Sequence, residues 1–358
     1  MDGRVHSNSP SSHPKSMRPL LFGLFFNCVL AIPLGKQTGY DDAEARRLVK
    51  LAAASYGNKH VPCIKKSFGN GENFHIESLE QKSCDHLDST CASYVVVSEN
   101  ARRIIVVFRG TKTKTQLLLE GWQSINDGID FFDMGNVNRY FLNAHLVLWP
   151  EIEKVITDAK WADYEITFTG HSLGGALAAL AAARTAKQGF RAGANIKVYT
   201  FGQPRVGNRQ FAGNFDALLP NTYRVVFRRD IVPHMPACHK NQTFVSTHEG
   251  GAKPCHADQL DYYHHGTEIW YPDEMTAGAH YVECLGAPKN EDFACSDRIK
   301  FFIDQSESYV WDHRHYFAVK VPPYGKTGCD DQFPEGKPSV FENVVSRINL
   351  LTRTIGLD

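Results

Sequence analysis

The sequence has no excess of charge of either sign, no paired-cysteine motif and no internal repeat, and each absence narrows the class of protein. Lys and Arg total 39 and Asp and Glu total 39, so the formal net charge is zero. Because no run of basic residues dominates a segment, nothing favours a nucleic acid as a partner. The lack of a C-x-x-C pair argues against a zinc or redox motif. No low-complexity linker marks a domain boundary, and 358 residues suffice for one large domain or two small ones.

Residues 1–35 are predicted to form a secretory signal peptide. A polar stretch with three basic residues precedes the apolar block 20–34, which is shorter than the roughly 20 residues of a membrane span. Met17 begins a segment that is a complete signal by itself, so it is a second possible start, and cleavage is expected near Gly35. The alternative is an N-terminal membrane anchor. A cleaved signal predicts a secreted, extracellular protein with no stable membrane anchor.

The cysteines fit an oxidising compartment. Nine are present, and Cys28 would be lost with the signal, which leaves an even number. Short spacings suggest three disulfides and leave a fourth that joins the two ends of the domain: Cys84–Cys91, Cys238–Cys255, Cys284–Cys295 and Cys63–Cys329. The one N-glycosylation sequon begins at Asn241, inside the proposed 238–255 loop, where a surface glycan would fit.

Apolar runs alternate with helical patterns along the middle of the chain. Strands are expected at 93–98, 103–110, 164–170, 196–202 and 223–229, and helices at 41–57, 145–160, 173–189 and 207–219. Almost wholly apolar strands that alternate with helices indicate a mostly parallel sheet covered on both faces. Residues 58–92 are expected to be irregular, and 111–144 a long connection. An amphipathic stripe in the extension 331–358 is expected to pack on the body, or alternatively to bind a membrane or partner.

Residues 170–174 form a G-x-S-x-G motif between a predicted strand and a predicted helix. At such a turn the serine hydroxyl projects from the carboxyl edge of the sheet, and the flanking glycines let the turn close. The helix start supplies N–H groups and a positive dipole end beside a reacting carbonyl. The alternative is a turn in which the serine only caps the helix. The context favours Ser172 as a nucleophile and Leu173 as an oxyanion donor.

A nucleophilic serine needs a base, and that base needs an orienting acid. Asp230 directly follows the predicted strand 223–229, beside a proline turn, and it comes after the serine as α/β-hydrolases require. The residue pattern alone leaves several histidines as candidates for the base: His234, His239, His248, His256, His264, His265, His280, His313 and His315.

Six segments narrow this choice by their resemblance to a known family. They are VVFRGT (106–111), TGHSLGGALAAL (169–180), TFGQPRVGN (200–208), RDIVPHMP (229–236), YYHHGTEIWY (262–271) and DHRHYF (312–317). Their order resembles that of the class 3 lipases, the fungal triacylglycerol lipase-like family, over residues 41–330. The resemblance implies a disulfide-stabilised α/β-hydrolase domain over 36–330.

The resemblance also implies a catalytic triad of Ser172, Asp230 and His313. The family's earlier histidine corresponds to His264 and is structural, and His264 or His265 remains the alternative base. His171 is expected to pack beneath the turn, and His315 to bond nearby.

Two further features are implied by the same resemblance. Thr111 corresponds to the second oxyanion donor, with a plain strand-ending residue as the alternative. The family's mobile lid corresponds to the segment after Thr111, where apolar side chains stand among polar ones: Leu117, Leu118, Leu119 and Trp122. The alternative is an ordinary core helix.

The sequence thus predicts a secreted serine carboxylic ester hydrolase, most strongly a triacylglycerol lipase that works through an acyl-enzyme at a lipid–water interface. This chemistry needs no metal and no cofactor. A phospholipase, an aryl or feruloyl-type esterase, and a catalytically silent lipid-binding protein are the alternatives. The oligomeric state is not predicted.

Overall fold

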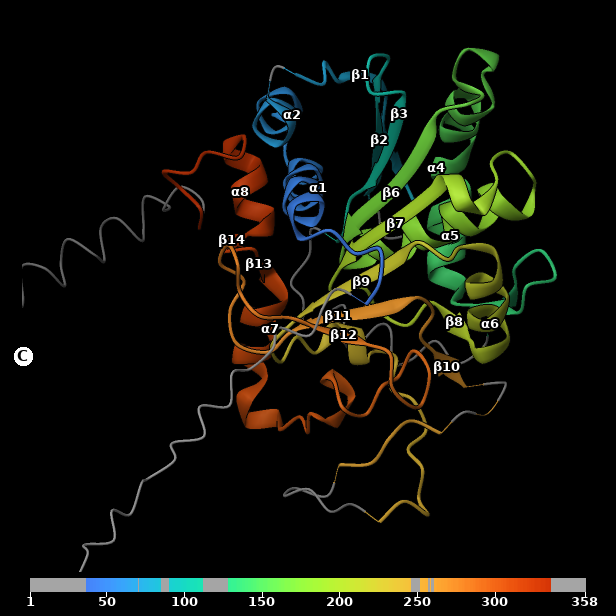
Figure 1. The fold of residues 1–358 in the computed structure, drawn as a ribbon, viewed down its shortest axis with the longest axis vertical. Coiled ribbons are helices and arrows are strands. Elements are labelled where there is room, and N and C mark those ends of the chain that lie inside the picture. The colour runs from blue at the N-terminus through green and yellow to red at the C-terminus, as the bar shows by residue number, and fades with distance from the viewer. Residues whose placement is uncertain are drawn as a thin grey trace, which may run out of the picture. The chain divides into compact units, whose positions relative to one another are not determined.

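An eight-stranded sheet forms the centre of the computed structural model (Figure 1). Its strands lie in the order β1 (His75–Ser83), β2 (Thr90–Ser98), β3 (Arg103–Phe108), β6 (Glu165–His171), β7 (Ile196–Phe201), β9 (Thr222–Phe227), β11 (Thr267–Tyr271) and β12 (Val282–Cys284). The pairs from β3 to β11 are parallel, and β1, β2 and β12 add antiparallel edges. The prediction of a mostly parallel sheet is confirmed.

The structure describes residues 37–69, 71–84, 90–111, 128–245, 252–256, 258 and 261–335. Apart from Gln37, these residues belong to the unit that begins at Thr38. The predicted signal peptide, the predicted lid with Leu117, Leu118, Leu119 and Trp122, and the amphipathic stripe beyond 335 lie outside the described residues. Within the described part of the chain, no helix is both long enough and apolar enough to cross a membrane.

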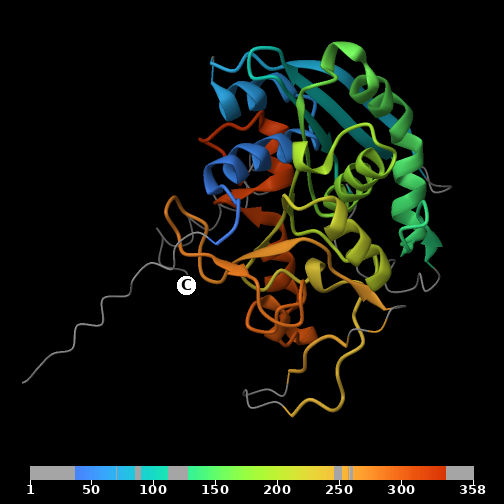
Figure 2. The same cartoon turned by 45° about the vertical axis from the view of Figure 1, so that its right-hand side comes forward.

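Helices cover both faces of the sheet (Figures 1 and 2). On one face lie α1 (Asp42–Ala54), α2 (His60–Phe68) and α8 (Val321–Thr327), and on the other lie α4 (Arg139–Thr157), α5 (Leu173–Lys187) and α6 (Arg209–Leu218). The strand β3 shows why its sequence is a continuous apolar run. Ile104 and Val106 point to the α5 face while Ile105 and Val107 point to the α1 face, so both faces are buried.

Smaller elements complete the described chain. The helix α7 (Ser306–Arg314) lies near the carboxyl ends of the parallel strands (Figure 1). A four-stranded sheet contains β4 (Ile129–Asp130), β5 (Asn136–Val137), β8 (Gly207–Asn208) and β10 (Tyr262–Tyr263), and β13 (His315–Tyr316) pairs with β14 (Val319–Lys320). Short 3-10 helices are Ala159–Trp161, Gly193–Asn195, Val232–His234, Ser296–Arg298 and Ile303–Gln305.

Two expectations about local structure were wrong. Residues 58–92, expected to be irregular, contain α2 and the edge strand β1, whose residues are exposed or half-buried in alternation. An edge strand without a buried apolar face gives no strong pattern in the sequence. The helix predicted from residue 145 begins at Arg139, because the Asn138 side chain accepts hydrogen bonds from the Tyr140 and Phe141 N–H groups and so caps it.

Four disulfides join the pairs that the spacing suggested: Cys63–Cys329, Cys84–Cys91, Cys238–Cys255 and Cys284–Cys295. The first has a sequence separation of 266 and ties α2 to the segment after α8, so it closes most of the folded domain into one loop. In the chain-entropy model, a loop of this length confers more stability than any one of the three short ones.

Candidate active site

The G-x-S-x-G motif forms a tight turn between a strand and a helix. β6 ends at His171, α5 begins at Leu173, and Ser172 lies between them with φ 61° and ψ −130°. This backbone conformation is strained for a residue with a side chain, and such strain occurs at catalytic turns. The Ser172 N–H donates to the Phe201 carbonyl at 2.9 Å, which fixes the turn against β7.

The two glycines of the motif are required by close backbone contacts. A Cβ atom on Gly170 would lie 2.3 Å from the carbonyl of Gly174, and one on Gly174 would lie 2.3 Å from the carbonyl oxygen of Phe108. These contacts bring the end of β3 against the first turn of α5. The segment that follows β3 is therefore close to the serine.

The structure brings Asp230 and His313 together at the carboxyl ends of the strands. Asp230 follows β9, His313 lies in the last turn of α7, and both side chains are buried. His313 Nδ1 lies 3.0 Å from each carboxylate oxygen of Asp230. Because a carboxylate accepts, Nδ1 carries a proton, and in the neutral imidazole the lone pair is then on Nε2. That is the tautomer of a general base.

Two further donors hold the Asp230 carboxylate. The Val232 N–H donates to Oδ1 at 2.9 Å, and the Tyr316 hydroxyl donates to Oδ2 at 2.5 Å. A Cβ on Gly202 would lie 2.6 Å from Oδ2 and 2.9 Å from His313 Nδ1, so the backbone after β7 packs directly on the pair. The buried carboxylate thus accepts hydrogen bonds from the Val232 N–H, the Tyr316 hydroxyl and His313.

Among the described residues no hydrogen bond joins Ser172 to this pair, but the residue before Ser172 packs against His313. The ring of the preceding residue, His171, stacks on the His313 ring with centroids 4.7 Å apart. Ser172 is 2% exposed, and its Oγ has no hydrogen-bond partner among the described residues. The buried Thr111 Oγ1 is also without one in the described part of the chain. The structure thus collects the serine turn, the Asp–His pair and the end of β3 at one edge of the sheet.

The alternative bases have other partners. His264 Nε2 donates to the Pro233 carbonyl at 2.6 Å, and the His265 ring lies against Phe215 with centroids 3.9 Å apart. Burial holds the pKa of both imidazoles well below the usual value. Neither contacts Asp230, so the geometry favours His313. His315 bonds the Trp311 carbonyl nearby.

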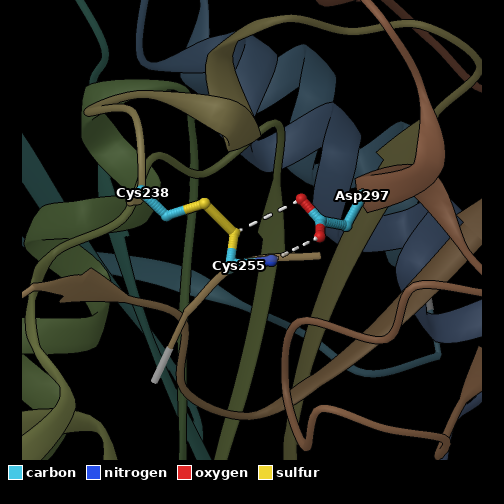
Figure 3. A group of neighbouring side chains, drawn as sticks. All are labelled: Cys238, Cys255 and Asp297. Carbon is cyan, nitrogen blue, oxygen red and sulfur yellow. Dashed lines mark hydrogen bonds between the residues drawn. A yellow bond between two sulfur atoms is a disulfide. The ribbon is translucent and has the colours of Figure 1, made fainter. Parts of the chain in front are cut away.

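Within the described residues, the groups of His, Cys, Asp and Glu that approach metal-site spacing contain disulfides. In Figure 3 the Cys238–Cys255 disulfide lies beside Asp297, whose carboxylate accepts the Cys255 N–H at 3.2 Å and the Lys240 ammonium at 2.6 Å. A second group, Glu268 with Cys284 and Cys295, also has its sulfurs joined. Metal binding needs free thiolates, so these donor sets do not fit a metal ion.

Sequence reasoning missed several residues around the predicted triad. Tyr316 lies in the DHRHYF segment, yet nothing in that segment showed that its hydroxyl would reach Asp230. A buried ion pair, Arg205 with Glu291, lies next to the loop that follows Asp230, and its members are 86 residues apart. No local pattern marks a contact over that separation.

Known proteins match both the sequence and the fold. The class 3 lipase profile matches residues 105–240. A lipase of Caenorhabditis elegans is 42% identical over 340 residues, which cover 94% of this chain and 96% of that protein. The crystal structure of a lipase from Rhizopus microsporus var. chinensis superposes with a TM-score of 0.62 at 25% identity, and covers 80% of this chain and 88% of that one.

A third match bears on the fold alone. It is a triacylglycerol lipase whose structure is described as having a serine protease triad at its catalytic centre, with a TM-score of 0.57 at 24% identity over 78% of this chain and 95% of that one. The central sheet and its helices are an α/β-hydrolase fold, as the sequence predicted. By its close relative and its fold, the chain belongs to the class 3 lipase family of carboxylic ester hydrolases.

Proposed function

We propose that the protein is a triacylglycerol lipase that uses Ser172, His313 and Asp230 as its catalytic triad. The observation that carries the proposal is the buried Asp230–His313 pair, in the base tautomer, beside a strained serine turn. A solved triacylglycerol lipase that shares this fold is described as having a serine protease triad at its catalytic centre, which fits a triad on this scaffold.

The residues would act in sequence. Ser172 Oγ attacks the ester carbonyl carbon while its proton moves to His313 Nε2, and Asp230 holds the imidazolium through Nδ1–H. The N–H groups of Leu173 and Thr111 stabilise the oxyanion. The C–O bond to the alcohol breaks, and His313 returns the proton to the leaving oxygen. Water then attacks the acyl-enzyme, gives its proton to His313, and the acid leaves as Ser172 Oγ recovers that proton.

Hydrolysis of a soluble p-nitrophenyl ester tests the triad. Ser172→Ala, Asp230→Asn and His313→Gln should each lower kcat by a factor on the order of 10³ or more. Ser308→Ala is the matched control, because its exposed hydroxyl donates to the carbonyl of Gln305, the residue before α7. Full activity of Ser172→Ala would overturn the proposal. If His313→Gln keeps its activity and His264→Gln loses it, the general base is His264 and not His313.

The substrate class depends on the segment that follows Thr111. We infer that Leu117, Leu118, Leu119 and Trp122 form a lid that exposes apolar side chains at a lipid surface. Rates on tributyrin below and above its solubility limit should then show a jump when droplets form. No jump, with equal rates on soluble aryl esters, would favour an esterase. A preference for phosphatidylcholine over triacylglycerol would favour a phospholipase.

Export is part of the same proposal. Four disulfides and the sequon at Asn241 suit an extracellular protein. The Asn241 side chain accepts hydrogen bonds from its own turn, at Thr243, and lies on the surface. We expect secretion into the medium of expressing cells, loss of residues 1–35, and a mass that falls on treatment with a peptide N-glycosidase. Retention in the membrane fraction would instead support an N-terminal anchor.

A further inference from the structure

Two buried side chains that the triad does not use, Tyr56 and His171, form a line of hydrogen bonds through the site. Tyr56 follows α1, and His171 is the last residue of β6. The Tyr56 hydroxyl lies 2.9 Å from His171 Nδ1, and His171 Nε2 lies 2.7 Å from the backbone carbonyl oxygen of His313. The line therefore ends on the backbone of the catalytic base.

The direction of each bond follows from the groups involved. A carbonyl oxygen only accepts, so His171 Nε2 carries a proton and donates it to the carbonyl of His313. His171 Nδ1 then has a lone pair and accepts from the Tyr56 hydroxyl. One neutral tautomer of His171 satisfies both bonds. Burial and the nearby His313 hold the pKa of His171 well below its usual value, so that tautomer persists at neutral pH.

The His171 ring also supports the base directly. Its plane is inclined 29° to that of His313 with centroids 4.7 Å apart, so the two imidazoles stack. His171 donates a hydrogen bond to the backbone carbonyl of His313 and also stacks on its ring. These two contacts restrict the orientation of the His313 imidazole. Asp230 fixes the Nδ1 end of the ring, and His171 fixes its plane and its backbone.

The other end of the line reaches the segment that carries Thr111. The Gly110 backbone lies directly against the Tyr56 hydroxyl. A Cβ on Gly110 would lie 2.1 Å from that hydroxyl and 2.6 Å from the His171 carbonyl, so this backbone has no freedom to move toward either group. Tyr56 thus connects the end of β3 to the serine turn.

We propose that Tyr56 and His171 are positioning residues that hold the base and the oxyanion-donor segment in register with the serine turn. This inference rests on the proposed triad, because it assigns a role relative to His313 and Thr111. Both residues act through other groups and touch no substrate. A misplacement of the reacting groups by about 1 Å can slow the chemical step by about 100-fold.

Variants of His171 whose side-chain amide lies at different distances from the backbone test the hydrogen bond from His171 Nε2 to the His313 carbonyl. The amide nitrogen of Gln at this position extends about as far as imidazole Nε2, whereas that of Asn stops near Nδ1. We expect His171→Asn to lower kcat on a soluble p-nitrophenyl ester by about 100-fold, and His171→Gln to retain kcat within about 5-fold of the wild type. KM should change less than about 2-fold in both, since no binding group is lost.

Tyr56→Phe tests the other bond and has a matched control in Tyr94→Phe. Tyr94 is likewise buried, and its hydroxyl donates to the Leu51 carbonyl at 2.7 Å. We expect Tyr56→Phe to lower kcat about 10-fold, while Tyr94→Phe leaves kcat unchanged although both lose one buried hydrogen bond. Unfolding midpoints measured for all four variants show whether loss of kcat follows loss of stability.

The possible results distinguish a failure of this inference from a failure of the proposed triad. Equal kcat for His171→Asn and His171→Gln, or loss of kcat that simply follows the unfolding midpoints, would overturn the positioning role. If Ser172→Ala stays active, the proposed triad fails instead, whatever His171 does. An inactive Ser172→Ala with fully active His171→Asn and Tyr56→Phe would leave the triad in place and refute the positioning role alone.

Discussion

Glu291→Gln tests whether the buried Arg205–Glu291 pair holds the loop that follows Asp230. Arg205 is 1% exposed in its side chain and Glu291 2%, and Nε and Nη2 each donate to a Glu291 oxygen at 2.7 Å. Arg205 also donates to the Pro236 carbonyl at 3.0 Å, and Glu291 accepts the His264 N–H at 2.9 Å. The pair therefore connects three segments that surround the acid of the triad.

The magnitude follows from the bonds that glutamine would lose. Glu291 accepts three N–H donors, two from Arg205 and one from His264. Glutamine has only one oxygen, so its NH₂ group would face at least one of these donors and leave it without an acceptor. The guanidinium loses its bidentate partner and keeps Asp297, at 3.9 Å, as a nearby anion. Breaking a buried ion pair on one side destabilises by 3–5 kcal/mol, and because shape and one acceptor survive we expect about 3 kcal/mol.

Urea unfolding followed by tryptophan fluorescence, with the disulfides intact, measures this loss. The midpoint should fall while the slope with urea stays the same. The control is Glu151→Gln, which removes an exposed partner of Lys154 and should not change the midpoint measurably. A loss below about 1 kcal/mol for Glu291→Gln would refute the view that this pair is an essential buried contact.

Three other changes have defined outcomes. Gly174→Ala puts a Cβ 2.3 Å from the Phe108 carbonyl oxygen, so it should lower both the unfolding midpoint and esterase activity; a fully active, equally stable variant would contradict the contact. Burial lowers the pKa of His145 to about 3, so its contribution to stability is present above pH 6.5 and is lost as the pH falls toward 3. His145→Phe should therefore flatten the pH dependence of the unfolding free energy by about 1.4 kcal/mol per pH unit in that range, and an unchanged slope would refute the assignment. Tyr316→Phe removes the 2.5 Å bond to Asp230 and should lower kcat about 10-fold with little change in KM, whereas an unchanged kcat would show that the carboxylate needs no third donor.

The sheet and the serine turn could be predicted because their signals are local. The strand β3 is buried on both faces, so its sequence RIIVVF is an almost continuous apolar run. Gly170, Ser172 and Gly174 are spaced as the turn requires, and Asp230 follows its strand directly. The edge strand β1 has no such run, so composition did not reveal it.

The base and the supporting contacts depend on distant parts of the chain. Several histidines follow the serine, and only the family resemblance separated His313 from the others. Tyr56 and His171 are 115 residues apart, and their bond has no counterpart in either local sequence. Contacts of this kind are set by the packing of α1 against β6, which a single sequence does not specify.

Covalent labelling tests the central claim most directly. A p-nitrophenyl phosphonate ester reacts with an activated serine and leaves a stable adduct whose position mass spectrometry can locate. The account predicts one adduct per chain, on the peptide that contains Ser172, formed in parallel with loss of esterase activity and absent in Ser172→Ala and in heat-unfolded protein. An adduct on another residue that abolishes activity would contradict the account. So would a Ser172→Ala variant that is still active and still fully labelled.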